Sequence, residues 1–324
     1  MKPAFSVVFL TTLIGAGQGL FLAYYSAEWL SVLSILPNET VQGAVSAGLL
    51  SLGLLVAGLI ASFFHLGHPE RAWRAAAMWR TSWLSREVIA LPLSMVLVLV
   101  YTILKLTDNQ IVAYELANGA PVLLEVVVGY AAMAVILVLF LCTAMIYTTL
   151  KFIKQWHSPL TVLNFVLLGS ASGFTLATAL SVHFDPNLFD YFSNFAIGLT
   201  LAGLLSRFVS LLRNKKLRKP TTLQSAIGIH HPNIRQMAQG AMGGSFNTRT
   251  FIHTYGAGVV RLARRFFLMA AFVLPVMLLL IGDETAVVLC VAAFSIQYLG
   301  LLVERWYFFI EADHPQNVYY QMIS

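Results

Sequence analysis

The sequence alternates long apolar segments with short polar ones. Eight stretches of predominantly apolar residues are each long enough to cross a bilayer as a helix, which takes about 20 residues. No stretch alternates polar and apolar positions as a barrel strand would, so helices are the expected spanning structure. We therefore predict an all-α integral membrane bundle with eight transmembrane helices, at about Ser6–Leu36, Val41–Phe64, Ser85–Leu106, Gly119–Leu150, Pro159–Val182, Phe189–Leu212, Arg264–Gly282 and Thr285–Ile310.

We expect residues 1–324 to form a single transmembrane domain, in which residues 213–263 make a long polar loop between the sixth and seventh helices. Composition agrees with a membrane protein, because 58% of the residues are hydrophobic and only 10% are charged. Soluble domains have roughly half apolar and a quarter charged residues. Small residues at Gly15 and Gly19, and again over 169–173, are typical of surfaces where two membrane helices pack closely.

The charged residues predict an orientation. With the N-terminus in the cytoplasm, nearly all Lys and Arg residues fall on inner segments, and Lys105 alone lies near an outer face. The outer turns hold acidic residues instead. We therefore expect a multi-pass protein of a bacterial inner membrane with both termini cytoplasmic. This asymmetry accounts for the net charge of +6, which makes nucleic acid the weaker interpretation of the basic loop.

The positions of the histidines and cysteines argue against haem, iron–sulfur clusters and metal ions bound by this chain. A membrane cytochrome needs paired histidines inside its helices, whereas all eight histidines here fall in expected loops or at helix ends. Cys142 and Cys290 stand singly inside helices, so we expect no iron–sulfur cluster and no haem. A metal site is also not expected, because His68, His230 and His231 lack a further ligand at a characteristic spacing.

The segment that joins the second and third helices concentrates unusual residues. It contains His65, Arg71 and several Trp and Arg residues, and Glu87 follows in the first turns of the third helix. Because consecutive helices usually pack as antiparallel neighbours, His65 and Glu87 are expected near each other at the inner interface. A quinone needs an apolar cleft and groups that hydrogen-bond and exchange protons at its carbonyl oxygens, which a His and a Glu can provide. Helix-end stabilisation by the same residues and interfacial anchoring by the Trp and Arg residues are the simpler alternatives.

Other ionisable residues lie inside the expected helices, where such groups often have a function. Glu28 and Glu125 lie toward the outer face and could face each other in a proton path, or could be acids at headgroup level. Glu304 and Arg305 lie toward the inner end of the last helix, where an interfacial charge pair is the favoured interpretation.

The segment His65-Leu66-Gly67-x-Pro69-x-Arg71-Ala72, followed by Ser85-x-Glu87, resembles the membrane anchor subunits of dimethyl sulfoxide reductase-type molybdoenzymes, within the polysulfide and nitrite reductase anchor superfamily. The eight expected helices extend the resemblance over the whole chain. Residues 224–232 and 240–249 look like the long inner loop of the sulfite dehydrogenase branch. The resemblance implies quinone binding, to menaquinone or ubiquinone, by His65 and Glu87, with Arg71 as a member of the motif.

The resemblance also implies partners, namely an iron–sulfur subunit and a molybdopterin catalytic subunit, with this chain passing electrons between the iron–sulfur subunit and the membrane quinone pool. The chain itself would not catalyse sulfur chemistry. Two other functions stay open: a structural anchor without a quinone site, and a secondary transporter. A transporter would show internal repeats with discontinuous helices, and the prolines and glycines of the first four helices do not recur in the last four.

Overall fold

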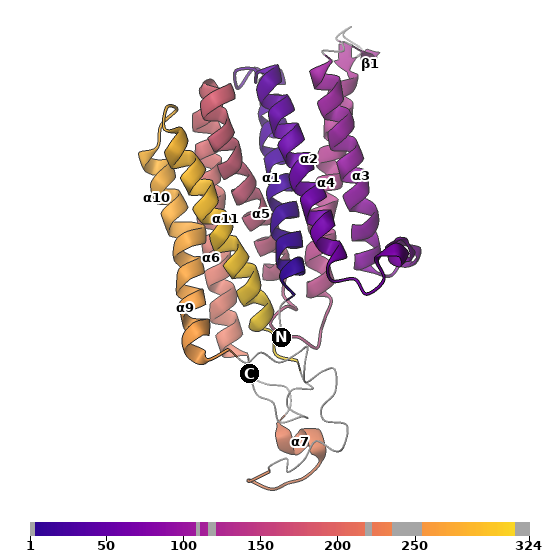
Figure 1. Ribbon diagram of the computed structural model, residues 1–324, viewed down its shortest axis with the longest axis vertical. Helices are drawn as coiled ribbons and strands as arrows, with labels where there is room; N and C mark the ends of the chain where they lie inside the picture. The colour runs from indigo at the N-terminus through magenta and orange to yellow at the C-terminus, as the bar shows by residue number, and fades with distance from the viewer. Residues whose placement is uncertain (1–3, 108–110, 116–120, 218–221, 235–254, 315–324) are drawn as a thin grey trace.

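A computed structural model describes residues 4–107, 111–115, 121–217, 222–234 and 255–314 (Figure 1). Eight helical spans in the described residues are long and apolar enough to cross a membrane, which confirms the predicted all-α bundle. The spans are α1 Phe5–Val32, α2 Val41–Phe63, α3 Trp83–Leu106, α4 Leu124–Thr148, α5 Pro159–Phe184, α6 Phe189–Lys216, the combined α9 Ala257–Leu268, η3 Met269–Val273 and α10 Leu274–Ile281, and α11 Val287–Ile310.

The spans run alternately up and down, so the bundle has two distinct ends (Figure 1). We call the end that holds the start of α1 and the end of α11 the proximal end, and the opposite end the distal end. The connection between α2 and α3 lies at the proximal end and contains the 3₁₀ helix η1 Pro69–Met78. The short elements β1 Val112–Glu115, β2 Pro121–Leu123 and η2 Pro186–Leu188 lie at the distal end, and α7 Leu223–Ile227 follows α6.

Helices α1 and α5 form the centre of the bundle and pack directly on each other. Their contact depends on glycine, because a Cβ at Gly19 would overlap the Gly169 carbonyl and one at Gly173 would overlap the Gly19 backbone. The small residues of the two segments noted in the sequence therefore face each other, and the backbones approach as in other small-residue membrane interfaces. Helices α2, α3 and α4 lie on one side of this glycine seam, and α6, α9, α10 and α11 lie on the other (Figure 1).

Side-chain caps fix where several spans begin. Thr40 accepts a hydrogen bond from the Gly43 amide at the start of α2, and Ser82 accepts one from the Ser85 amide at the start of α3. Ser158 caps α5 ahead of a proline at its first position, where the missing N–H costs nothing. The cap at Ser82 places Glu87 one turn inside α3, near the proximal end.

Three helix boundaries differ from those expected. The predicted helix from Gly119 begins only at Leu124, since residues 121–123 pair with β1 as a short hairpin. The seventh span begins at Ala257, before Arg264, because three arginines lower the hydropathy of its amphipathic first turns. Helix α6 continues to Lys216. The connection predicted over 213–263 is therefore shorter at both ends, and its residues 218–221 and 235–254 lie outside the described residues.

A π-helical segment interrupts the seventh span just before Pro275. A proline has no amide to donate to the carbonyl four residues earlier, which here belongs to Ala271. The Gln297 side chain of α11 donates to that carbonyl from 3.4 Å. A backbone acceptor freed by the proline is thus satisfied by a neighbouring helix, as membrane helices require.

Candidate functional site

Glu87 faces the interior of the bundle at the proximal end. Its side chain is buried between α3 and α4, and one carboxylate oxygen accepts a hydrogen bond from the Thr143 hydroxyl at 2.5 Å. The apolar residues Ala90 and Leu91 follow one turn deeper and pack with Ile14, Leu55 and Leu139. An ionisable group in such surroundings is costly to bury and is a functional candidate in a membrane protein. The geometry therefore favours a chemical role over simple stabilisation of the helix end.

His65 lies two residues beyond the end of α2, on the same end of the bundle as Glu87. Its side chain is exposed at the surface of the protein, and within the described residues no hydrogen bond or ion pair joins it to Glu87 or Arg71. Partial burial lowers the pKa of His65, so the neutral imidazole is favoured at neutral pH. The neutral ring can both donate and accept a hydrogen bond.

An apolar groove runs along the surface between α1 and α2 and includes Phe64, the residue before His65 in the sequence. Its volume is about 340 Å³, and it is lined by Phe9 and Leu13 of α1 and by Ala57, Ile60 and Phe64 from the other side. Small-molecule sites in proteins are mostly apolar and have volumes of about 300–1,000 Å³. A groove of this size and lining could hold an apolar ring or isoprenoid chain.

Arg71 lies in η1 with an exposed side chain, and its Nε is 3.6 Å from a Glu70 oxygen that also contacts His68. The end of η1 is tied to α3 through Arg86, which donates to the Trp79 and Arg80 carbonyls at 2.9 and 2.8 Å. Arg71 therefore presents its guanidinium to the surroundings of the protein, away from Glu87.

A second buried charged group lies at the proximal end, on α6 and α11. Glu304 binds Arg207 through one oxygen and Arg305 through the other, both at 2.8 Å. All three side chains are at most 5% exposed. Glu304 and Arg305 therefore form the charge pair favoured from sequence, and both side chains are buried within the protein. The sequence did contain a signal for Arg207, because an arginine at that position falls within the expected helix Phe189–Leu212.

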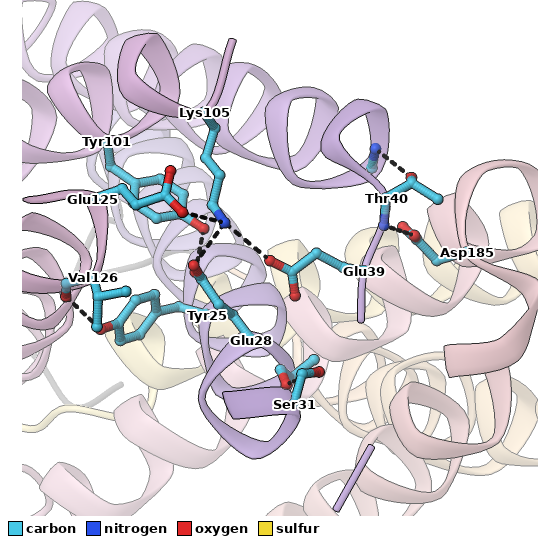
Figure 2. A network of polar contacts seen from close by, with 12 residues as sticks. Tyr25, Glu28, Ser31, Glu39, Thr40, Tyr101, Lys105, Glu125, Val126 and Asp185 are labelled. Atoms are coloured by element: carbon cyan, nitrogen blue, oxygen red, sulfur yellow. Dashed lines mark hydrogen bonds and ion pairs between the residues drawn. The ribbon is translucent and has the colours of Figure 1, made fainter. Parts of the chain in front are cut away.

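Glu28 and Glu125 meet at the distal end around one lysine (Figure 2). The Lys105 ammonium lies 2.7 Å from Glu28, 3.2 Å from Glu125 and 3.5 Å from Glu39. The Tyr101 hydroxyl donates to Glu28 at 2.5 Å. Burial, and next the Glu28 carboxylate, raise the pKa of Glu39 to about 8. Glu28 and Glu125 thus share a partner, and a proton path through them stays a prediction.

Within the described ranges, no three His, Cys, Asp or Glu side chains are placed to hold a metal ion. Sequence reasoning found Glu87 but not its partner Thr143, since a threonine inside an apolar helix has many roles and gives no distinctive signal. The loop residues 240–249, which suggested the sulfite dehydrogenase branch, lie outside the part of the chain that the structure describes.

Comparison with known proteins identifies the family. Residues 1–320 match the family described as DMSO reductase anchor subunit (DmsC). The chain is also 48% identical to a sulfite dehydrogenase subunit of Allochromatium vinosum, with both chains covered completely. The expected resemblance to these anchor subunits is confirmed. With its eight apolar spans, the chain is a multi-pass membrane protein that belongs to the DMSO reductase anchor subunit (DmsC) family.

Proposed function

We propose that this chain is the quinone-binding membrane anchor of a molybdopterin and iron–sulfur oxidoreductase complex, and that it passes electrons between the iron–sulfur subunit and the membrane quinone pool. The observation that carries the proposal is the buried Glu87 carboxyl, which lies at the same end of the bundle as His65 and the apolar groove that includes Phe64. The Allochromatium relative is named as part of a sulfite dehydrogenase, which supports sulfite as the substrate of the partner subunits.

The groups at the proximal end would have different roles in quinone binding, proton exchange and partner contact. The groove between α1 and α2 would take the isoprenoid chain and exclude water from it. His65 would hydrogen-bond one carbonyl oxygen of the quinone, and Glu87 would hold or release a proton on the interior side. Arg71, exposed at the protein surface, would contact the partner subunit or lipid headgroups.

The partner subunits would dock at the proximal end. The exposed surface around η1 carries Arg71, Arg74 and Arg80 together with the exposed rings of Trp73 and Trp79. Arginine and tryptophan are enriched in the central contacts of protein interfaces. Docking at this end would bring the iron–sulfur clusters to the side of the membrane that holds Glu87, which keeps the electron-transfer distance short.

The proximal end would face the cytoplasm of a bacterial inner membrane. The described loops and helix termini there carry Lys151, Lys154, Arg213 and Lys215, whereas the distal ones carry Glu115, Asp190, Asp283 and Glu284. This distribution follows the positive-inside rule. Reporter fusions after Lys216 should be active in the cytoplasm, and a periplasmic signal there would overturn the orientation.

The test is turnover of the whole complex with quinone and with a soluble electron mediator. His65→Ala and Glu87→Gln should lower quinone-linked turnover by roughly 100-fold, the lower range for lost acid–base catalysis, and leave mediator-linked turnover unchanged. His157→Ala is the matched control, because His157 is also an exposed proximal histidine and bonds a backbone carbonyl of its own loop.

Two results would redirect the proposal. Normal quinone-linked rates in both variants, with a quinone analogue still bound, would move the site elsewhere in the bundle. A complex that contains this chain but binds no quinone analogue would leave a structural anchor. Purification without molybdenum or iron would contradict both kinds of anchor and favour the transporter.

A further inference from the structure

We propose that water in two small cavities beside the Arg207, Glu304 and Arg305 side chains forms the path by which protons move between the proximal surface and Glu87. We call these three side chains the proximal charge cluster. The inference rests on the proposed function, since it supplies the protons that a quinone site at Glu87 would exchange. It also assigns a role to three buried charges on helices that do not contribute His65 or Glu87.

The cavities lie one on each side of Arg305. The inner cavity, of about 20 Å³, is lined by Thr12, Gln18, Thr143, Ser172 and Arg305 among others. The surface cavity, of about 10 Å³, is lined by Asn164, Arg207, Ser210, Arg213 and Glu304, and again by Arg305. A cavity needs about 10–15 Å³ and several polar neighbours to hold one water molecule. Both cavities therefore match the size of a single water.

Polar atoms that lack a protein partner line these cavities. They are Arg305 Nη1, Asn164 Oδ1 and Gln155 Oε1, all buried. A buried polar atom without a partner costs about 1–3 kcal/mol, and ordered water is the usual remedy. These orphaned atoms thus indicate water positions independently of the cavity volumes.

Each cavity reaches one end of the proposed path. Thr143 lines the inner cavity and donates to Glu87, so the cavity reaches the carboxyl group through one hydroxyl. At the other end, Arg213 lines the surface cavity and donates to the Lys154 and His157 carbonyls, both at 3.1 Å, on exposed proximal loop residues. Between the two ends, Arg305 and Phe165 line both cavities, and Glu304 lines the surface cavity.

On the distal side, the inner cavity borders apolar side chains. Phe140 lines the inner cavity and belongs to an apolar cluster with Phe21, Tyr25 and Ile136. Beyond this cluster lies Glu28, held by Tyr101 and Lys105. We therefore place the proton path on the proximal side of Glu87.

The chemistry requires such a path. Reduction of a quinone to the quinol takes up electrons and protons in equal numbers, and the quinol releases both when it is oxidised. The electrons would come from or go to the partner's iron–sulfur clusters, and the protons would pass through Glu87 to the water of the inner cavity. Because Glu87 is enclosed by protein, it needs connected water to exchange its proton with the surface.

The test fills the surface cavity without touching Glu87. Asn164→Leu replaces the cavity-lining amide by an apolar side chain, and Gln155→Leu is a second variant at a less buried position. Gln297→Met is the matched control, because Gln297 is also a buried amide that bonds Thr200 at 3.0 Å on another part of the α6 and α11 interface. The assembled complex is measured in water and in heavy water, with quinone-linked turnover, mediator-linked turnover and quinone-analogue affinity as readouts.

We expect Asn164→Leu to lower quinone-linked turnover roughly tenfold, within the range of slowed proton transfer, and to raise its solvent isotope effect. Gln155→Leu should do the same to a smaller extent. Analogue affinity, mediator-linked turnover and the Gln297→Met variant should be unchanged. Equal slowing in Gln297→Met would overturn this inference alone. The same holds for unchanged turnover and an unchanged isotope effect in both cavity variants, provided that the wild-type complex turns over quinone. A wild type without quinone-linked turnover would overturn the proposed function and the inference together.

Discussion

The distal end surrounds one ammonium group with three carboxylates, whereas the proximal end places two guanidinium groups on Glu304, with a second carboxylate, Glu311, 3.5 Å from Arg207. Both clusters are buried, and both join helices that are distant in sequence. They differ in whether their charged groups can change protonation state. A carboxyl group can bind a proton, while a guanidinium stays charged at every ordinary pH. The Glu39 carboxyl group of the distal cluster can therefore take up a proton, whereas the two proximal guanidinium groups stay charged and depend on Glu304 and Glu311.

The two clusters therefore differ in role: the distal cluster joins helices, and the proximal charge cluster belongs to the proposed proton path. The distal contacts hold Lys105 of α3 against α1, α4 and the connection that precedes α2, which fixes four segments to one point (Figure 2). The proximal charge cluster lies between two cavities with orphaned polar atoms. Buried charge alone thus does not identify a functional site. The two water-sized cavities beside the proximal charges are the observation on which we base different roles for the two ends.

Removing the central charge of each cluster should give the largest effect. Glu304→Gln leaves Arg305 buried without a counter-charge and leaves Arg207 with Glu311 alone at 3.5 Å, which should cost about 3–5 kcal/mol of stability. Lys105→Met should cost less near pH 6, because its carboxylates can take up protons, and the cost should grow toward about pH 9. Thermal unfolding of the purified complex across this range measures both. A pH-independent cost for Lys105→Met would contradict the proposed difference between the clusters.

The glycine seam between α1 and α5 should hold both clusters in one rigid arrangement. Gly173→Val puts side-chain atoms onto the backbone of Gly19 and Leu20 and should lower stability by about 1–3 kcal/mol or more. Gly198→Ala is the control, because a Cβ there meets no described atom within 4 Å. The melting temperatures of the two variants should differ by several degrees. Equal melting temperatures would mean that the glycine seam does not stabilise the bundle.

The sequence predicts a feature of the fold when a run of neighbouring residues determines it. The eight spans follow from runs of apolar residues, which the bilayer itself requires, so the fold was predictable. The start of the seventh span was not, because Arg261, Arg264 and Arg265 hide an amphipathic helix from a hydropathy scan. The hairpin before α4 is likewise too short for a distinctive pattern.

The candidate site was predictable in position and not in detail. The alternation of spans places His65 and Glu87 at one end, as expected from the antiparallel helices. The direction of each side chain depends on contacts with α4, α6 and α11, which lie far away in sequence. The bonds from Thr143 to Glu87 and from Arg207 to Glu304 therefore could not be predicted from spacing.

The distal cluster should show its own titration through Glu39. The pKa of Glu39 is raised to about 8 in the folded protein, so the folded state binds this proton more tightly than the unfolded state. That contribution to stability is fully present below the ordinary carboxyl pKa and is lost as the pH rises toward about 8. Glu39→Gln should flatten the fall in melting temperature over this window by a few degrees. Glu115→Gln, an exposed distal control, should leave the slope as in the wild type.

The finest comparison removes one hydroxyl from each end. Tyr101→Phe and Thr143→Val each delete a hydroxyl that donates to a carboxylate at 2.5 Å, and each keeps the shape of the side chain. The two losses should cost similar stability, about 1 kcal/mol each. Only Thr143→Val should slow quinone-linked turnover, because only its hydroxyl connects Glu87 to the inner cavity. Melting temperatures and quinone-linked turnover of both variants are measured in the same complex. Slower quinone-linked turnover in Tyr101→Phe would mean that the distal cluster exchanges protons with the quinone site.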